Sequence, residues 1–221
     1  RGATGPTDWF PNGVDAQFFQ PSDPPYEPDL VTFVGRMDYF PNQQAVQRFC
    51  ADVLPEIQRR RPGTRFEIVG ADPPEAIREL GLRTGVTVTG SVPDVRPYVT
   101  RAALTVAPLE IARGTQNKIL EAMAAGVPVV TSRVAAGGVD AVGREHFLVG
   151  STPEEYRDAI LRILGDPAER RRQDDGRLHV ARAVGQGMPE RVGELGKLQH
   201  ERALQIPVAV QAGCKPEMAF Q

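Results

Sequence analysis

Short apolar segments alternate with amphipathic segments along most of the chain. The apolar segments are rich in Val, Ile and Phe and stop at Gly or Pro, which is typical of buried parallel strands; they are Leu30–Val34, Phe66–Val69, Val86–Thr89, Leu104–Ala107, Val127–Val130 and Phe147–Val149. Between them, helical spacing of apolar residues and Gly or Pro stops predict helices over Asn42–Arg60, Pro73–Leu82, Val95–Arg101, Asn117–Ala125, Thr152–Leu164 and Pro167–Val184. The alternation predicts an α/β fold, a doubly wound, Rossmann-like domain with a parallel sheet of about six strands.

The two ends of the chain lack this alternation. Residues 1–29 are rich in Pro, Gly and Asp, and we expect a segment that connects the domain to another part of the protein. The α/β domain itself is predicted to span residues 30–185. Residues 186–221 are expected to form a C-terminal helix and a partly disordered tail. The chain begins without an initiating Met, so we expect it to be a piece of something longer.

Composition narrows the class of protein. Of 221 residues, 41% are hydrophobic and 24% charged, which is ordinary for a soluble globular domain. The formal net charge of −2 leaves no basic excess for a nucleic-acid partner. Two cysteines cannot form a disulfide framework, which favours a reducing cytoplasm. No apolar run is long enough to span a membrane, so we expect membrane association only through a missing part of the protein.

Several common sites are absent from the sequence. It has neither the G-x-G-x-x-G fingerprint of dinucleotide binding nor a G-x-x-x-x-G-K-[ST] phosphate loop. No His, Cys, Asp and Glu residues have the spacing of metal ligands, and the three histidines lie far in sequence from the strand ends. We therefore expect no metal and no redox cofactor.

The best candidates for ligand binding directly follow the strands, because ligands bind beyond the carboxyl ends of open parallel sheets. Arg36 follows the first strand after Gly35, where a guanidinium can bind phosphate oxygens in a bidentate manner. After the fourth strand, a turn with Gly114 leads into the helix that carries Lys118 and Glu121. The free N–H groups and dipole at the start of such a helix can hold a phosphate. The structural alternative is an ordinary crossover helix with solvated charges. After the second and third strands, Gly70 and Gly90 are more simply explained as turn residues.

Five motifs resemble the carboxyl-terminal, donor-binding half of a group 1 glycosyltransferase, the retaining, nucleotide-sugar-dependent type with the GT-B fold. They extend over about residues 11–185 and are Pro11–Asp15 with Phe19 and Pro21, Val34–Met37, Phe66–Gly70, Val88–Val92 and Leu120–Val130. Met37–Asn42 and Gly114–Lys118 are further similar to a subgroup associated with bacterial exopolysaccharide and exosortase loci. The segment Leu120–Val130 is the most specific of these.

The resemblance implies a donor site for a nucleotide-diphosphate sugar, without a metal. Glu121 would accept hydrogen bonds from the ribose hydroxyls, Arg36 would meet the diphosphate, and Val92 would contact the base through its backbone. The helix start would enclose the sugar and phosphates with Gly114, Thr115, Gln116, Asn117 and Lys118. The acceptor would bind to a missing N-terminal domain of the same protein.

Two positions depart from the family pattern. The family usually has two glutamates separated by seven residues, but the position eight before Glu121 is Arg113, and the nearest acid is Glu110. Either the donor sugar is unusual, or Arg113 binds a charged or phosphate group. A lysine usually follows the Gly-Arg pair by about five residues, where this chain has Pro41 and Asn42. We expect Lys118 to supply the missing cation.

These inferences predict a donor-binding domain that transfers a sugar with retained configuration when joined to its other half, and that is inactive alone. Two alternatives stay open. One is a non-catalytic nucleotide-sugar-binding module, which the loss of the first glutamate favours. The other is an epimerase of the same architecture, which would need acid and base groups in the cleft that the sequence does not place there.

Overall fold

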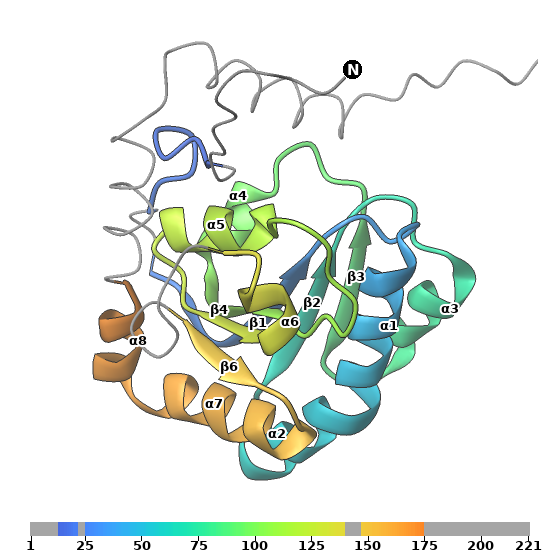
Figure 1. The fold of residues 1–221 in the computed structure, drawn as a ribbon. Coiled ribbons are helices and arrows are strands. Elements are labelled where there is room, and N and C mark those ends of the chain that lie inside the picture. Colours follow the sequence, from blue (N-terminus) through green and yellow to red (C-terminus); the bar gives the residue numbers. More distant parts are fainter. Residues whose placement is uncertain (1–12, 22–24, 140–146, 175–221) are drawn as a thin grey trace, which may run out of the picture.

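The computed structural model describes residues 13–21, 25–139 and 147–174, and its centre is a parallel sheet of six strands (Figure 1). The strands are β1 (Glu27–Val34), β2 (Arg65–Val69), β3 (Val86–Gly90), β4 (Ala102–Ala107), β5 (Val129–Ser132) and β6 (Leu148–Gly150). Their order is β3-β2-β1-β4-β5-β6. All five neighbouring pairs are parallel. The predicted α/β class and Rossmann-like sheet are confirmed.

Helices connect the strands and follow the last of them. They are α1 (Phe40–Arg48), the π-helix η1 (Phe49–Val53), α2 (Leu54–Arg60), α3 (Glu75–Arg78), the 3₁₀ helix η2 (Glu79–Leu82), α4 (Arg96–Thr100), α5 (Asn117–Ala124), α6 (Arg133–Ala136), α7 (Pro153–Gly165) and α8 (Pro167–Asp174). None of these described helices has the length and apolar character needed to cross a bilayer. The helix predicted over Pro167–Val184 is described as far as Asp174, and the rest of that prediction lies outside the described residues.

Three details differ from the predicted pattern, and a hydrogen bond or a lack of periodicity explains each. β1 begins at Glu27 rather than Leu30, because the Glu27 N–H donates to the Arg101 carbonyl across the sheet (2.8 Å). β5 begins two residues later than predicted, since the Val127 N–H is used to end the preceding helix. The short α6 was not predicted, because four residues show no periodicity; the Ser132 hydroxyl caps it by accepting from the Ala135 N–H (3.0 Å).

The long helix predicted over Asn42–Arg60 widens into a π-helical turn before Pro55. Pro55 has no N–H with which to continue the α-helical ladder. The turn before it opens into η1, in which the Leu54 N–H donates to the carbonyl of Phe49 five residues earlier. The apolar stripe continues through this turn, with Phe49 and Ile57 both buried.

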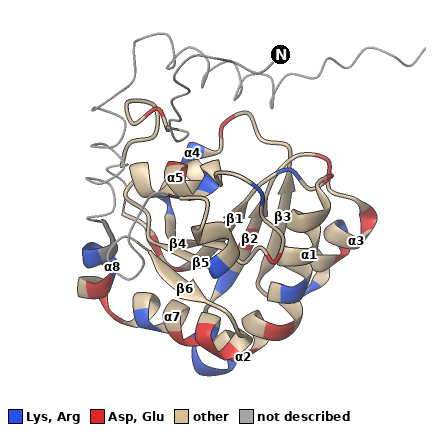
Figure 2. Ribbon diagram, in the orientation of Figure 1, with Lys and Arg blue, Asp and Glu red and all other residues tan. Residues whose placement is uncertain are grey.

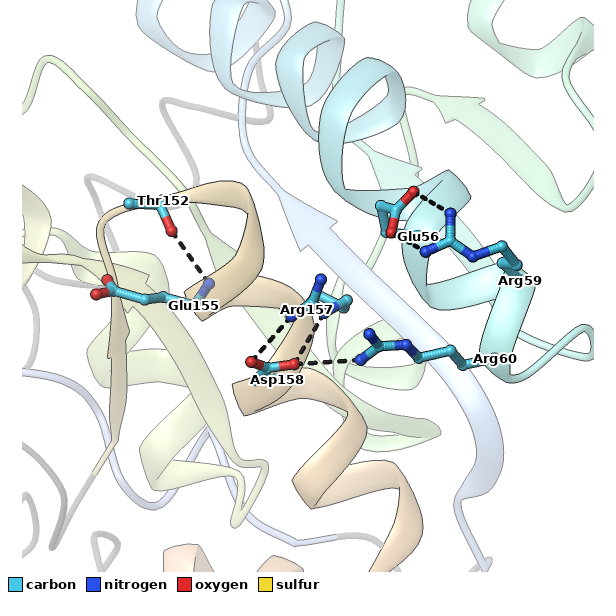
Figure 3. Close-up of polar contacts among 7 residues, drawn as sticks. All are labelled: Glu56, Arg59, Arg60, Thr152, Glu155, Arg157 and Asp158. Carbon is cyan, nitrogen blue, oxygen red and sulfur yellow. Dashed lines mark hydrogen bonds and ion pairs between the residues drawn. The ribbon is translucent and has the colours of Figure 1, made fainter.

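Apolar burial holds α7 to the sheet and to α2. α7 packs alongside η1 and α2 (Figure 1), and Ile57 on α2 and Ile160 and Ile163 on α7 are buried. Figure 3 shows polar contacts at this edge, among them the ion pair between Arg60 and Asp158 (3.4 Å), whose side chains are exposed. Exposed pairs of this kind contribute about 0–1 kcal/mol each, so the apolar contacts dominate.

The described segment before β1 also packs on the domain. Val14 and Phe19 belong to the hydrophobic core, and the Arg96 guanidinium at the start of α4 lies 3.9 Å from the centre of the Phe18 ring. Figure 2 shows both signs of charge distributed over α2, α7 and α8. The strands between them carry few charges.

Candidate functional site

The candidate site lies where the strand order reverses. β1 and β4 are neighbours in the sheet, but the chain leaves β1 toward β2 and leaves β4 toward β5. At such a point the loops after the two strands diverge and leave a crevice at the carboxyl edge of the sheet. The loop Gly35–Tyr39 follows β1, and the loop Pro108–Gln116 follows β4 and leads into α5.

The glycines after the first three strands pack closely at this edge. The Gly35 N–H donates to the Val69 carbonyl (3.0 Å), and the Gly70 N–H donates to the Gly90 carbonyl (3.2 Å). A Cβ on Gly70 would lie only 1.8 Å from the Gly35 carbonyl oxygen. Gly90 has a φ of 72°, the left-handed region that favours glycine. Gly70 and Gly90 are thus accounted for by chain geometry, which agrees with the turn interpretation.

The start of α5 has no side-chain cap among the described residues. Gln116 is the N-cap residue of this eight-residue helix, and its side chain does not bond the first backbone N–H groups. The loop before it turns at Gly114, whose φ is 65°. A Cβ on Gly138, in the turn after α6, would lie 2.3 Å from the Gly114 carbonyl oxygen. The loop is therefore braced by the segment that follows β5.

The end of α5 was predicted correctly. Gly126 has a φ of 69°; its N–H donates to the Met123 carbonyl (3.0 Å), and the Val127 N–H donates to the Ala122 carbonyl (2.9 Å). This is a Schellman motif, which glycine favours. The two charged residues of the helix, Lys118 and Glu121, are three positions apart and therefore share one face.

Lys118 reaches from α5 to the end of β1. Its Nζ donates to the Asn42 Oδ1 atom (2.7 Å) and lies 4.4 Å from the centre of the Phe33 ring. A Cβ on Gly35 would lie 2.8 Å from this Nζ, so the missing side chain of Gly35 leaves the space that the ammonium group occupies. The fold thus brings together Gly35 and Lys118, two of the predicted site residues.

Glu121 and Lys118 line the same small pocket between α5, β1 and β4. Its other lining residues are mostly apolar: Val34, Val99, Thr105, Val106, Ala107, Ile119 and Val129. Burial lowers the pKa of Lys118 to about 7, against the opposing effect of the Glu121 charge. Burial likewise raises the pKa of Glu121 to about 7, and Lys118 opposes that shift. Burial thus favours the neutral form of both groups, a perturbation that is frequent at functional sites.

Arg36 lies at the same strand end, bound to two carboxylates. Its guanidinium donates to both oxygens of Asp38 (3.0 and 2.6 Å) and to Asp72 (3.3 Å). The hydrogen bond to Asp38 raises the pKa of Arg36. Asp72 has a φ of 55°, uncommon for a residue with a side chain. An anion that binds Arg36 must compete with these carboxylates.

The other predicted residues are more dispersed. Arg113 is exposed, and its side chain has no hydrogen-bond or ion-pair partner in the described part of the chain. Glu110, the nearest acid, forms an ion pair with Arg48 of α1. Val92 follows β3, two strands away from β1, and packs half-buried against the core. Among residues 13–21, 25–139 and 147–174, no three His, Cys, Asp or Glu side chains gather as a metal site would require.

Asn42 was noted in the sequence only because it replaces a lysine of the family pattern. It is 5% exposed; its Nδ2 donates to the Arg36 carbonyl (2.8 Å), and its Oδ1 accepts from Lys118. One sequence signal could have indicated it. A polar Asn shares the buried face of α1 with Ala45 and Val46, and a buried amide needs partners.

A comparison with protein families identifies one match. The profile described as "Glycosyl transferases group 1" matches residues 28–166, more than half of the chain. Among curated proteins, an exopolysaccharide phosphotransferase of Streptomyces coelicolor is 33% identical over 132 residues, which cover 56% of this chain. The chain spans only 14% of the length of that relative.

Solved structures share the fold. A sucrose-phosphate synthase of Thermosynechococcus elongatus superposes with a TM-score of 0.66 and 24% identity, covering 90% of this chain and 53% of the other. The HepE protein of Anabaena, crystallised in complex with UDP and glucose, gives a TM-score of 0.62 and 14% identity, covering 86% of this chain and 55% of the other. In both cases the chain corresponds to about half of the larger protein.

Proposed function

The chain belongs to the group 1 glycosyltransferase family, and we propose that it is the part of a retaining enzyme that binds the nucleotide-sugar donor. One observation carries this proposal: the ammonium group of Lys118 lies beside Gly35, in the crevice where the strand order reverses and where the uncapped start of α5 faces the same edge. Cationic and N–H groups in a crevice of this kind are suited to a diphosphate.

The chemistry of sugar transfer explains why such groups would be useful. When the bond between sugar and diphosphate breaks, negative charge develops on the leaving nucleoside diphosphate. Groups that are already aimed at that charge stabilise the transition state more than the ground state. Lys118 and the first N–H groups of α5 would supply this stabilisation without a bound metal ion.

The remaining roles follow from the position of each residue. Glu121, on the same face of α5 as Lys118, would accept hydrogen bonds from the ribose hydroxyls. Arg36 would bind the diphosphate after releasing Asp38. Further along the same edge, the backbone at Val92 would contact the base, and the residues 114–117 would enclose the sugar.

A second domain would complete the enzyme. The chain corresponds to about half of the similar solved proteins, so we propose that an N-terminal domain of the same protein binds the acceptor and closes over the donor. The HepE complex with UDP supports a nucleotide-linked donor. The name of the Streptomyces relative supports a role in exopolysaccharide assembly, and we place this role in the cytoplasm.

A non-catalytic binding module is the second candidate. Arg113 stands where the family has its first glutamate, and Glu110 is occupied by Arg48, which leaves the loop before α5 without a free carboxylate. Full-length protein that binds a donor, yet neither hydrolyses nor transfers it, would favour this candidate. Retained configuration in a sugar product, measured by NMR of its anomeric proton, would favour the enzyme.

Binding is tested first. Thermal unfolding of the full-length protein would be followed with UDP, GDP, ADP and their sugars, since a ligand that binds only the folded state raises its stability. We expect one base series to raise the melting temperature, and Lys118→Ala to reduce the rise. The proposal is wrong if no nucleotide stabilises the protein, or if Lys118→Ala keeps the wild-type affinity.

A further inference from the structure

Asn42 joins the two candidate phosphate-binding elements through a single side chain. Its Nδ2 donates to the carbonyl of Arg36 in the loop after β1 (2.8 Å), and its Oδ1 accepts from Lys118 on α5 (2.7 Å). Asn42 and Lys118 are 76 positions apart in the sequence. Both polar atoms of the amide are thus used, and they are used to connect elements on either side of the crevice.

The chemistry of the partners fixes the orientation of this amide. A carbonyl oxygen only accepts hydrogen bonds, and an ammonium group only donates them. A flipped amide would direct its NH₂ group at Lys118 and its oxygen at the Arg36 carbonyl, so both contacts would be lost. Among side chains of this size, only an amide can serve both partners, because a carboxylate has no proton to donate to the Arg36 carbonyl.

Packing confines the ammonium group to this place. The Phe33 ring of β1 lies on one side of the Lys118 Nζ, at 4.4 Å from the ring centre. The Asn42 amide and the Cα of Gly35 close in as well, since a Cβ on Gly35 would lie 2.8 Å from both the Lys118 Nζ and the Asn42 Nδ2. Asn42 itself is buried at the start of α1.

We infer that Asn42 is a positioning residue of the donor site: its amide holds the Lys118 ammonium group beside the Gly35–Arg36 turn, where that group meets the phosphates of a nucleoside diphosphate. The inference rests on the proposed function. It assigns no direct ligand contact to Asn42, which acts through Lys118 and through the loop that carries Arg36.

The charges around Lys118 give the inference a pH signature. Glu121 is the charged group that faces it from its own helix. The Lys118 ammonium group also faces two uncharged groups, the Phe33 ring of β1 and the Asn42 amide of α1. The Arg36 guanidinium is directed at Asp38 and Asp72 instead. Because burial lowers the pKa of Lys118 to about 7, its charge, and with it phosphate binding, should weaken as the pH rises through neutrality.

The test measures UDP binding by calorimetry at pH 6 and pH 8, on the full-length protein, with GDP or ADP in its place if the thermal panel selects one of them. Asn42→Asp is nearly isosteric and puts a carboxylate against Lys118. It should raise the pKa of Lys118. We expect affinity at pH 6 to fall about tenfold, because the added charge repels phosphate, and the loss of affinity between pH 6 and pH 8 to become smaller than in the wild type.

Gln43→Glu is the matched control. Gln43 is the next residue of α1, and its side-chain amide also donates to a carbonyl of the same loop, that of Met37 (2.8 Å), but it does not contact Lys118. The Gln43→Glu variant should change the affinity for UDP by less than about threefold and keep the pH dependence of the wild type. The ionisation of UDP is common to all variants and cancels in the comparison.

A double-mutant cycle covers the case in which Asn42→Asp folds poorly. Asn42→Ala should weaken UDP binding in the wild-type background. It should have much less effect in the Lys118→Met background, because the ammonium group that Asn42 positions is then absent. Equal effects in both backgrounds, or an Asn42→Asp variant with the wild-type affinity and pH dependence, would overturn the inference. Wild-type protein that binds no nucleotide would instead refute the proposed function, and this inference with it.

Discussion

The charged cluster at the amino-terminal side of the sheet allows the fold to be tested independently of the site. Arg101, directly before β4, donates to both oxygens of Glu67 in the middle of β2 (2.5 and 2.6 Å). It also forms an ion pair with Glu27 at the start of β1 (3.1 Å). The Glu67 side chain is only 8% exposed. Arg101→Met would keep much of the aliphatic packing and leave that carboxylate buried without its main partner.

The loss of stability in Arg101→Met depends on pH, because the buried Glu67 carboxylate becomes neutral when it takes up a proton. Losing one partner of a buried pair costs about 3–5 kcal/mol. At pH 7, protonating a carboxyl with the ordinary pKa of 4.5 costs about 3.4 kcal/mol. This cost is the upper limit of the stability that the unpaired charge of Glu67 can remove. At pH 5 the same limit is about 0.8 kcal/mol. Burial already raises the pKa of Glu67 while Arg101 opposes the rise, so removing Arg101 raises it further.

We therefore expect Arg101→Met to lower the free energy of unfolding by about 3 kcal/mol at pH 7 and by about 1 kcal/mol at pH 5. The sign follows from proton binding: between these pH values the folded variant holds a proton on Glu67 that the unfolded chain releases, so its stability falls as the pH rises. Urea unfolding at the two pH values, followed by circular dichroism, measures the difference. A Glu67→Gln/Arg101→Met double variant should lose the pH dependence, since the amide carries no charge.

The control is Arg65→Met, which removes a neighbouring pair with Glu27. Arg65 is 53% exposed, and we expect a loss below about 1 kcal/mol at either pH. If Arg101→Met destabilised the protein equally at pH 5 and pH 7, or no more than Arg65→Met, the reasoning from the buried carboxylate would be refuted. Nucleotide affinity should be unchanged in the folded variants, because the cluster lies at the opposite end of the strands from the site.

Three further outcomes are expected at the site itself. Lys118→Met should stabilise the protein without nucleotide at pH 7 by about 4 kcal/mol, since it removes the cost of an ammonium group whose pKa is lowered from 10.5 to about 7. In thermal unfolding the gain should fall below about 1 kcal/mol toward pH 10. Asp38→Asn should strengthen nucleotide binding several-fold in calorimetry, as Arg36 loses a competing carboxylate; unchanged affinity would mean that Arg36 does not meet the ligand. Removing divalent ions with EDTA should leave the affinity within about twofold, and a larger loss would argue for a bound cation.

The sheet could be predicted from the sequence because its determinants are local. Each strand is an apolar run with its own stop signal, and the turn at Gly126 needs only the residues next to it. The same reasoning correctly identified the start of α5 as the opening of a crossover helix. It was less accurate where a residue interrupts the helical hydrogen bonds, as Pro55 does by lacking an N–H, or where an element is as short as α6.

The internal geometry of the site could not be predicted in this way. The contact between Lys118 and Asn42 joins residues 76 positions apart, and no local pattern specifies it. Neither did the sequence indicate that Asp72 would adopt a positive φ and direct its carboxylate at Arg36. Both depend on where neighbouring strands end, which is decided by the sheet as a whole. The sequence therefore suggested which residues gather at the edge, but not which of them are in contact.

The two ends of the sheet differ in how they compensate buried charge. At the amino-terminal side, one Arg101 nitrogen donates to both oxygens of the Glu67 carboxylate and offsets part of the cost of its burial. At the carboxyl side, Lys118 is compensated by a neutral amide and an aromatic ring, and burial brings its pKa down to about 7. A lysine held in this way lowers the stability of the empty domain, since water would solvate it better. A doubly charged diphosphate beside it reverses that balance by favouring the ammonium form, so the binding of a donor at this site should be accompanied by proton uptake near neutral pH.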